Sequence, residues 1–139
     1  MPNDKLLTDK PALTLAAAKK IIAAAEAEAL KRNWPVVIAV VDEGGNLISL
    51  QRLDNAQFGS VEVAIRKAKS AAAFKRPTKA WEETLAAGHH RVLGLPGVVP
   101  SEGGVPLIWQ GQIVGAIGVS GVKSSEDGQI ARAGAAVLE

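Results

Sequence analysis

Two short segments of this 139-residue chain are apolar on both faces of a strand, and they constrain the fold most strongly. Val36–Asp42 reads VVIAVVD, and Ile113–Ser120 reads IVGAIGVS. Because such strands must be covered on both sides, we expect them to be neighbours at the centre of a sheet that lies between helices. On the second strand Ala116 and Gly118 leave one face very small, so a helix, a neighbouring subunit or a flat ligand can approach it closely.

Each apolar strand belongs to a predicted hairpin. The turn at residues 43–46 (EGGN) leads into Leu47–Leu53, whose mixed polarity indicates an edge strand. The turn Gly111-Gln112 joins Val105–Gln110 to the last strand. Strict alternation along that strand places Ile113 on the same face as Ile117 and Val114 on the opposite face.

Apolar residues at helical spacing predict four helices. The first helix is expected from a cap at Thr14 to about Arg32, and the second from Ser60 to about Phe74. The third is expected from a cap at Thr78 to Gly88. The fourth is a terminal helix that follows a capping box between Ser124 and Asp127. Residues 89–104 form the longest irregular stretch, with a short strand expected at 97–100. We expect residues 1–12 to be an N-terminal arm and residues 13–139 to be one α+β domain.

Composition narrows the classes of function. Hydrophobic residues make up 47% of the chain and charged residues 22%, which suits one folded domain. A net charge of +2 and 4% aromatic residues argue against nucleic-acid binding. Cysteine is absent, which excludes disulfides and thiolate sites. Since no segment has the apolar length of a signal peptide or membrane span, we expect no membrane association and a cytoplasmic location.

The glycine-rich segment 115–125 (GAIGVSGVKSS) suggests a phosphate-binding loop at first sight. A Walker loop needs glycine directly before the lysine, and here Val122 precedes Lys123. Close packing on a strand of small residues is the better interpretation.

The histidines His89 and His90 follow the third predicted helix, and the chain has no others. Neighbouring residues on a helix point in different directions, so the two would not chelate one metal together. Either could ligate haem iron singly; the ordinary alternative is that both end a helix and face solvent or a subunit contact. Tyrosine, like cysteine, is absent, which removes two other common haem ligands.

Basic residues cluster around the end of the second helix. Lys75 and Arg76 directly precede the helix expected to start at Thr78, where free N–H groups and two cations would attract a carboxylate or a haem propionate. A solvated basic face is the ordinary alternative. Gly103 and Gly104 precede a strand, and their N–H groups either line a concavity or belong to a plain tight loop. The three tryptophans are expected to anchor the core or an interface.

Three segments together resemble the GlcG/HbpS family, which also includes the C-terminal domain of PduO-type proteins. They are Ala64–Thr78 (AIRKAKSAAAFKRPT), Gly103–Gly121 (GGVPLIWQGQIVGAIGVSG) and Glu126–Leu138 (EDGQIARAGAAVL). The resemblance implies a profilin-like fold with a five-stranded antiparallel sheet flanked by helices on both faces. It also implies assembly into homo-oligomers. Ser70 stands where many relatives have threonine, and Thr78 is kept, so either hydroxyl is a candidate ligand contact.

Within this family some members bind haem and some degrade it, while others accompany glycolate, diol or corrinoid metabolism. The leading hypothesis is therefore a haem-binding protein with weak haem-degrading activity, in which His89 or His90 binds iron and Lys75 and Arg76 bind the propionates. The alternative is an enzyme or accessory factor that holds a small carboxylate metabolite at Gly103, Gly104 and the start of the Thr78 helix. A third possibility is a structural or interaction protein without a ligand.

Overall fold

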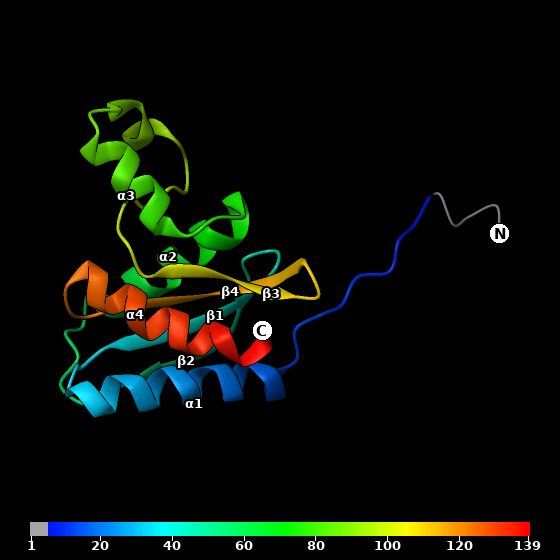
Figure 1. The fold of residues 1–139 in the computed structure, drawn as a ribbon, viewed down its shortest axis with the longest axis horizontal. Coiled ribbons are helices and arrows are strands. Elements are labelled where there is room, and N and C mark those ends of the chain that lie inside the picture. Colours follow the sequence, from blue (N-terminus) through cyan, green and yellow to red (C-terminus); the bar gives the residue numbers. More distant parts are fainter. Residues whose placement is uncertain (1–5) are drawn as a thin grey trace.

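A computed structural model describes residues 6–139 of the chain, and Figure 1 shows its fold. The elements, in order, are α1 (Leu15–Arg32), β1 (Val37–Asp42), β2 (Leu47–Arg52), α2 (Ser60–Phe74), α3 (Thr78–Ala86), the 3₁₀ helix η2 (His90–Gly94), β3 (Gly104–Trp109), β4 (Gln112–Ser120), α4 (Ser124–Ala135) and the 3₁₀ helix η3 (Ala136–Leu138). Residues 6–12 of the expected arm contain neither helix nor strand, and residues 1–5 lie outside the described part.

The described strands form one antiparallel sheet of four strands in the order β2-β1-β4-β3. The two apolar strands β1 and β4 are central neighbours and β2 is an edge, as the sequence predicted. The expectation of five strands is wrong. Residues 97–100 join no ladder, because the Val98 N–H donates to the Leu95 carbonyl and the Val99 N–H donates to the Ser70 hydroxyl.

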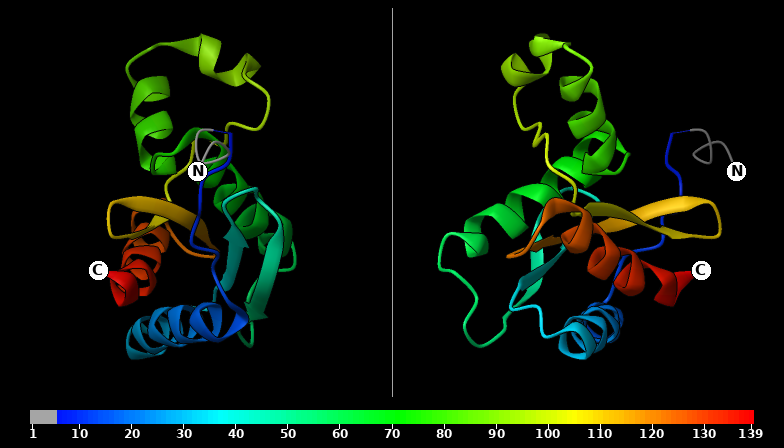
Figure 2. Two further views of the ribbon diagram at one scale, coloured as in Figure 1. Left: turned by 90° about the vertical axis from the view of Figure 1, so that its right-hand side faces the viewer. Right: turned by 60° about the vertical axis from the view of Figure 1, so that its left-hand side comes forward.

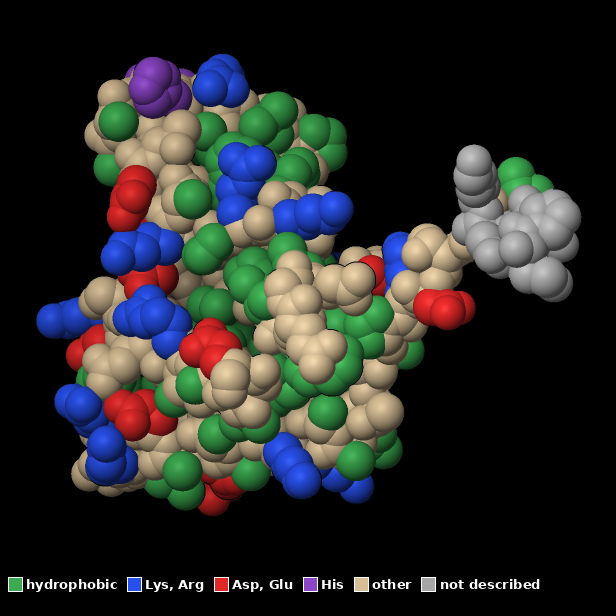
Figure 3. Space-filling view, turned by 45° about the vertical axis from the view of Figure 1, so that its right-hand side comes forward, with side chains coloured by type: hydrophobic (Ala, Val, Ile, Leu, Met, Phe, Trp, Pro, Cys, Tyr) green, Lys and Arg blue, Asp and Glu red, His purple; other side chains and the backbone are tan. Residues whose placement is uncertain are grey.

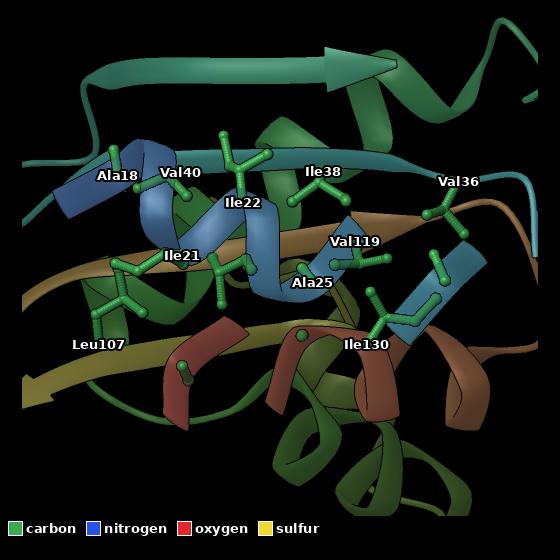
Figure 4. Close-up of a cluster of buried hydrophobic side chains, with 14 of the residues drawn as sticks. Ala18, Ile21, Ile22, Ala25, Val36, Ile38, Val40, Leu107, Val119 and Ile130 are labelled. Carbon is green, nitrogen blue, oxygen red and sulfur yellow. The ribbon is translucent and has the colours of Figure 1, made fainter. Parts of the chain in front are cut away.

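Helices cover both faces of the sheet. α1 and α4 lie side by side on one face, and α2 covers the other (Figure 2). On the first face Ile21 and Ile22 of α1 pack against Ile38, Ile117 and other side chains of the sheet in the main hydrophobic core (Figure 4). Burial of these branched side chains is the chief source of stability, at roughly 1.5–3 kcal/mol for each fully buried side chain.

Small residues let α2 pack very closely on the opposite face. A Cβ on Gly118 would collide with the backbone of Ala64 and would lie 2.6 Å from the Ala68 nitrogen. The sequence left a helix, a neighbouring subunit or a flat ligand as possible partners of this small strand face, and in the structure helix α2 covers it. A flat ligand has no room between α2 and β4.

A β-bulge changes which side chains of β4 face the core. Leu107 pairs with Gly115 and Ile108 pairs with Ile113, so Val114 is an extra residue in β4. Val114 therefore joins the main core, whereas Ile113 lies on the other side, next to Ala72 of α2. Strict alternation, which placed Ile113 with Ile117, fails because a bulge shifts the pattern by one residue.

Helix starts follow the sequence in part. Thr14 caps α1, since its hydroxyl accepts a hydrogen bond from the Ala17 N–H at 3.1 Å. At α4 the cap is Lys123 rather than Ser124, and the Lys123 N–H donates to the Glu126 carboxylate at 3.3 Å.

Among residues 6–139, no helix combines the length and apolar character needed to cross a membrane.

Candidate functional site

Residues 75–103, which carry α3 and η2, project from the body of the molecule and are called the lobe below (Figures 1 and 2). The lobe leaves the body at the end of α2 and returns to it at the start of β3. Basic side chains gather where the lobe meets the body, and the histidine side chains lie at its far end (Figure 3). Most residues that the sequence singled out belong to the lobe or to its two junctions.

An arginine–aromatic stack lies at the root of the lobe. The Arg76 guanidinium lies 4.7 Å from the centre of the Trp81 ring, and the Arg76 Nε donates to the Phe74 carbonyl at 3.1 Å. Phe74 and Trp81 meet edge to face at 5.5 Å. The Trp81 Nε1 is buried without a hydrogen-bond partner among the described residues. Arg76 therefore links the end of α2 to α3, and the half-buried Trp81 packs against Phe74 at the junction of these helices.

Lys75 points elsewhere although it is the neighbour of Arg76. It ends α2 in the left-handed conformation, with φ of 55°. Its side chain lines a hollow of about 360 Å³ together with Lys10, Glu43 and Gln112. Lys10 pairs with Glu43 at 3.3 Å, while Lys75 forms no ion pair within residues 6–139. The two cations at this junction therefore face different surroundings.

The two histidines lie at the far end of the lobe. His89 precedes η2 and His90 is its first residue, and both side chains are exposed. Val92 is buried and fixes η2, whereas Leu93 is 67% exposed. Residues three apart on a 3₁₀ helix are eclipsed, so His90 and Leu93 project from the same face. An imidazole and an exposed apolar side chain thus lie together there.

The hydroxyls and glycines at the base of the lobe are all engaged in internal hydrogen bonds. Thr78 is fully buried and is the first residue of α3, with Pro77 as the cap, so the prediction that Thr78 caps this helix is wrong. Its hydroxyl instead accepts from the Gly104 N–H at 2.9 Å. The Gly103 carbonyl accepts from the Val119 N–H at 2.9 Å. Ser70 is also fully buried and accepts from the Val99 N–H at 3.2 Å.

A buried ion pair lies next to this base, and the sequence interpretation missed it. Lys67 of α2 and Asp127 of α4 meet at 3.1 Å with side chains only 2% and 3% exposed. The Lys67 Nζ also donates to the Val119 carbonyl, and Asp127 accepts from the Val122 N–H. Gly103 beside this pair has φ of 137°, and a Cβ there would lie 2.5 Å from the Val119 carbonyl oxygen, which explains the glycine.

Burial raises the pKa of Asp127 to about 6, even though the Lys67 ammonium acts to lower it. A signal for this pair was present in the sequence. Lys67 falls on the same helical stripe as Ala64, Ala68 and Ala71, which are all buried, and a cation on such a stripe needs a buried acceptor.

The structure therefore separates the candidate residues into three groups. His89 and His90 are exposed at the far end of the lobe, Lys75 and Arg76 lie at its root, and the remaining four candidates form the interior base. α3 has nine residues, so its two ends lie about 13 Å apart. Within residues 6–139 no group of three histidine, aspartate or glutamate side chains could hold a metal ion.

Comparison with known proteins supplies the family. The family model described as "Haem degrading protein HbpS-like" matches residues 13–136. Protein GlcG of Escherichia coli K12 is 44% identical over 103 residues, which cover 74% of this chain and 77% of GlcG.

Two solved structures share the fold. A double mutant of HbpS from Streptomyces reticuli has a TM-score of 0.87 at 39% identity, covering 96% of this chain and 92% of the HbpS chain. A structure described as a PduOC–haem complex has a TM-score of 0.82 at 28% identity, covering 93% of this chain and 96% of the PduOC chain. With helices on both faces of the sheet and a family match over almost its whole length, the chain belongs to the GlcG/HbpS family.

Proposed function

We propose that this protein binds haem at the far end of the lobe, with His90 as the iron ligand. Its family and the haem complex of a structural neighbour support haem as the ligand class. The observation that carries the location is the pairing of His90 with Leu93 on one face of η2.

The residues on that face fit the two requirements of a haem contact. A neutral imidazole nitrogen is a common axial ligand of haem iron. An exposed leucine beside it would cover part of an apolar macrocycle that otherwise stays in water. His89 precedes η2 with φ of −84° and ψ of 78°, so it does not share the eclipsed alignment with Leu93.

The propionates would reach cations in one of two directions. Arg91 is exposed and adjacent to His90 in the lobe. At the root of the lobe, Lys75 and Arg76 are the other cations that could hold the propionates. Of these two, Lys75 is the better candidate, because Arg76 already stacks on Trp81.

The alternative of a small carboxylate at Gly103, Gly104 and Thr78 has less support. The Gly104 N–H and the Thr78 hydroxyl bond each other, and the side chain of Lys67 occupies the space beside Gly103. A carboxylate would have to replace these internal hydrogen bonds before it could bind.

Bound haem would supply a redox-active iron, and an exposed site would leave it open to small oxidants. Haem degradation, which the name of the family model describes, is therefore part of the proposal for this chain. Loss of Soret absorbance under a reductant and oxygen, compared with free haem under the same conditions, measures it. Association of copies into a homo-oligomer also stays a prediction, measured by sedimentation velocity.

A Soret titration of the full chain tests the binding proposal. We expect saturation near one haem per chain, and His90→Ala should weaken binding by at least about tenfold, which corresponds to roughly 1.4 kcal/mol. Leu93→Asn should weaken binding without moving the Soret maximum. The matched variant His89→Ala should leave both affinity and spectrum unchanged.

Three results would count against the proposal. If His89→Ala alone removes the spectrum, the iron ligand has been assigned to the wrong histidine. If neither histidine variant changes the titration, haem binds elsewhere. If the wild-type spectrum stays that of free haem, the protein does not bind haem and the proposal is wrong.

A further inference from the structure

A groove lies on the body of the molecule, between the end of α1 and the segment formed by the end of β2 and the residues after it. It has a volume of about 490 Å³, within the range of roughly 300–1,000 Å³ that small-molecule sites occupy. In Figure 1 these two segments meet at the lower left, away from the lobe. The groove is therefore separate from the proposed haem site.

Six polar side chains line this groove, and their hydrogen-bonding capacity is largely free. Within residues 6–139 none of them forms a side-chain hydrogen bond or an ion pair, although Arg52 stacks over the exposed Phe58 ring at 5.4 Å. The six are Glu26, Asn33, Gln51, Arg52, Asp54 and Asn55. Nearby Glu28, by contrast, pairs with Lys31 and Arg32 and accepts from Gln129.

The backbone fixes both walls of the groove. Asn33 ends α1 in the left-handed conformation, with φ of 58°, and Asn55 has φ of 69° in the opposite wall. Between the walls lies an apolar floor that includes the buried Ala29 and Leu53 and the half-buried Trp34 ring. The lining therefore combines apolar surface with both donors and acceptors.

The chemistry of the lining selects a class of ligand. Amide side chains both donate and accept, the two carboxylates only accept, and the guanidinium only donates. A sugar offers the matching surface, since each hydroxyl donates and accepts while the C–H face packs on apolar or aromatic groups. Two carboxylates lie in the lining with the Arg52 guanidinium, and the Arg32 guanidinium stacks over the Trp34 ring at 5.5 Å, so the charges balance and favour a neutral ligand.

We propose that this groove binds a neutral sugar of about monosaccharide size. Trp34 and Leu53 contact its C–H surface, and Gln51, Asp54 and Asn55 contact its hydroxyls. This site does not depend on haem binding, so either proposal can fail while the other holds.

Titration of the ¹⁵N-labelled full chain with D-glucose, D-galactose and D-ribose, followed by NMR, tests this proposal. We expect saturable shifts of the Trp34 indole and of the Asn33 and Asn55 backbone amides for at least one of these sugars. Gln51→Ala and Asp54→Ala should each weaken binding by at least about tenfold. The matched variants Gln112→Ala and Asp9→Ala remove the same chemistry outside the groove and should leave binding unchanged.

Three outcomes would overturn the assignment. The first is that none of the three sugars causes a saturable shift. The second is that Gln51→Ala and Asp54→Ala leave binding intact. The third is that glucose 6-phosphate binds more tightly than glucose. Both groove variants are exposed or half-buried side chains, and the dispersion of their own NMR spectra shows whether they remain folded.

Discussion

At the scale of single residues, Thr78 shows how a residue with a familiar role can take another one. Its position before a short helix favours a cap, yet its hydroxyl is buried and accepts from the Gly104 N–H. This bond ties the first turn of α3 to the start of β3. Thr78 therefore closes the base of the lobe, where the chain leaves the body and returns.

Thr78→Val keeps the shape of the side chain and removes this acceptor. The Gly104 N–H would be left buried and unpaired, so the free energy of unfolding should fall by about 1–3 kcal/mol. Urea denaturation measures the change. Thr84→Val, which removes a hydroxyl that donates within α3, should change stability by no more than about 0.5 kcal/mol; equal losses in the two variants would contradict this role of Thr78.

Asp127 gives the stability of the fold an unusual dependence on pH. Its pKa rises from 3.8 to about 6 on folding because of burial, so between these values the folded chain binds more protons than the unfolded chain. The stabilising contribution of this group is therefore complete below about pH 3.8 and is lost as the pH rises through 6.

The expected slope is at most about 1.4 kcal/mol per pH unit for one proton. Between pH 4 and pH 6, the difference in unfolding free energy between the wild type and Asp127→Asn should therefore change with pH. A difference that stays constant from pH 4 to pH 6 would show that the pKa of Asp127 is not raised in the folded state.

At the scale of elements, the contact between α2 and β4 organises the sheet. Gly118 lets the helix backbone approach the strand, so Gly118→Ala should force the two apart and cost about 1–3 kcal/mol or more. Gly59→Ala is the matched control, because a Cβ there meets nothing within 4 Å. Chemical denaturation compares the two; a neutral Gly118→Ala would mean that α2 packs less closely than described.

Sequence patterns predicted these elements well where one rule acted alone. Runs that are apolar on both faces identified β1 and β4 as central, and the 3.6-residue stripe gave α1 and α2 nearly to the residue. They failed where tertiary contacts decided the outcome. The bulge at Val114 depends on pairing with β3, and residues 97–100 bond to Leu95 and Ser70 instead of to a neighbouring strand.

The candidate site was less predictable than the fold. Lys75 and Arg76 are neighbours in sequence, but the left-handed turn at Lys75 directs them to different surroundings. The ion pair of Lys67 and Asp127 joins residues sixty positions apart, which no local motif encodes. Lys67 on an otherwise apolar helical stripe indicated that a buried acceptor exists, but the sequence pattern did not identify Asp127 as that acceptor.

At the scale of the whole molecule, the packed body and the candidate haem site lie in different parts of the structure. The body is a four-stranded sheet between helices, and its small-residue face is filled by α2. The lobe carries both histidines and exposed apolar side chains beyond this packed body. The central claim is that haem binds on the lobe through His90, outside the closed interface of α2 and β4.

Paramagnetic broadening of backbone amide signals by ferric haem tests this claim most directly, with diamagnetic zinc protoporphyrin as the control. We expect the strongest broadening at residues 89–95, and His90→Ala should abolish it while residues 115–120 of β4 stay sharp. The claim would be contradicted if the broadening were centred on β4 or on the groove beside Trp34, or if His90→Ala left the broadening unchanged.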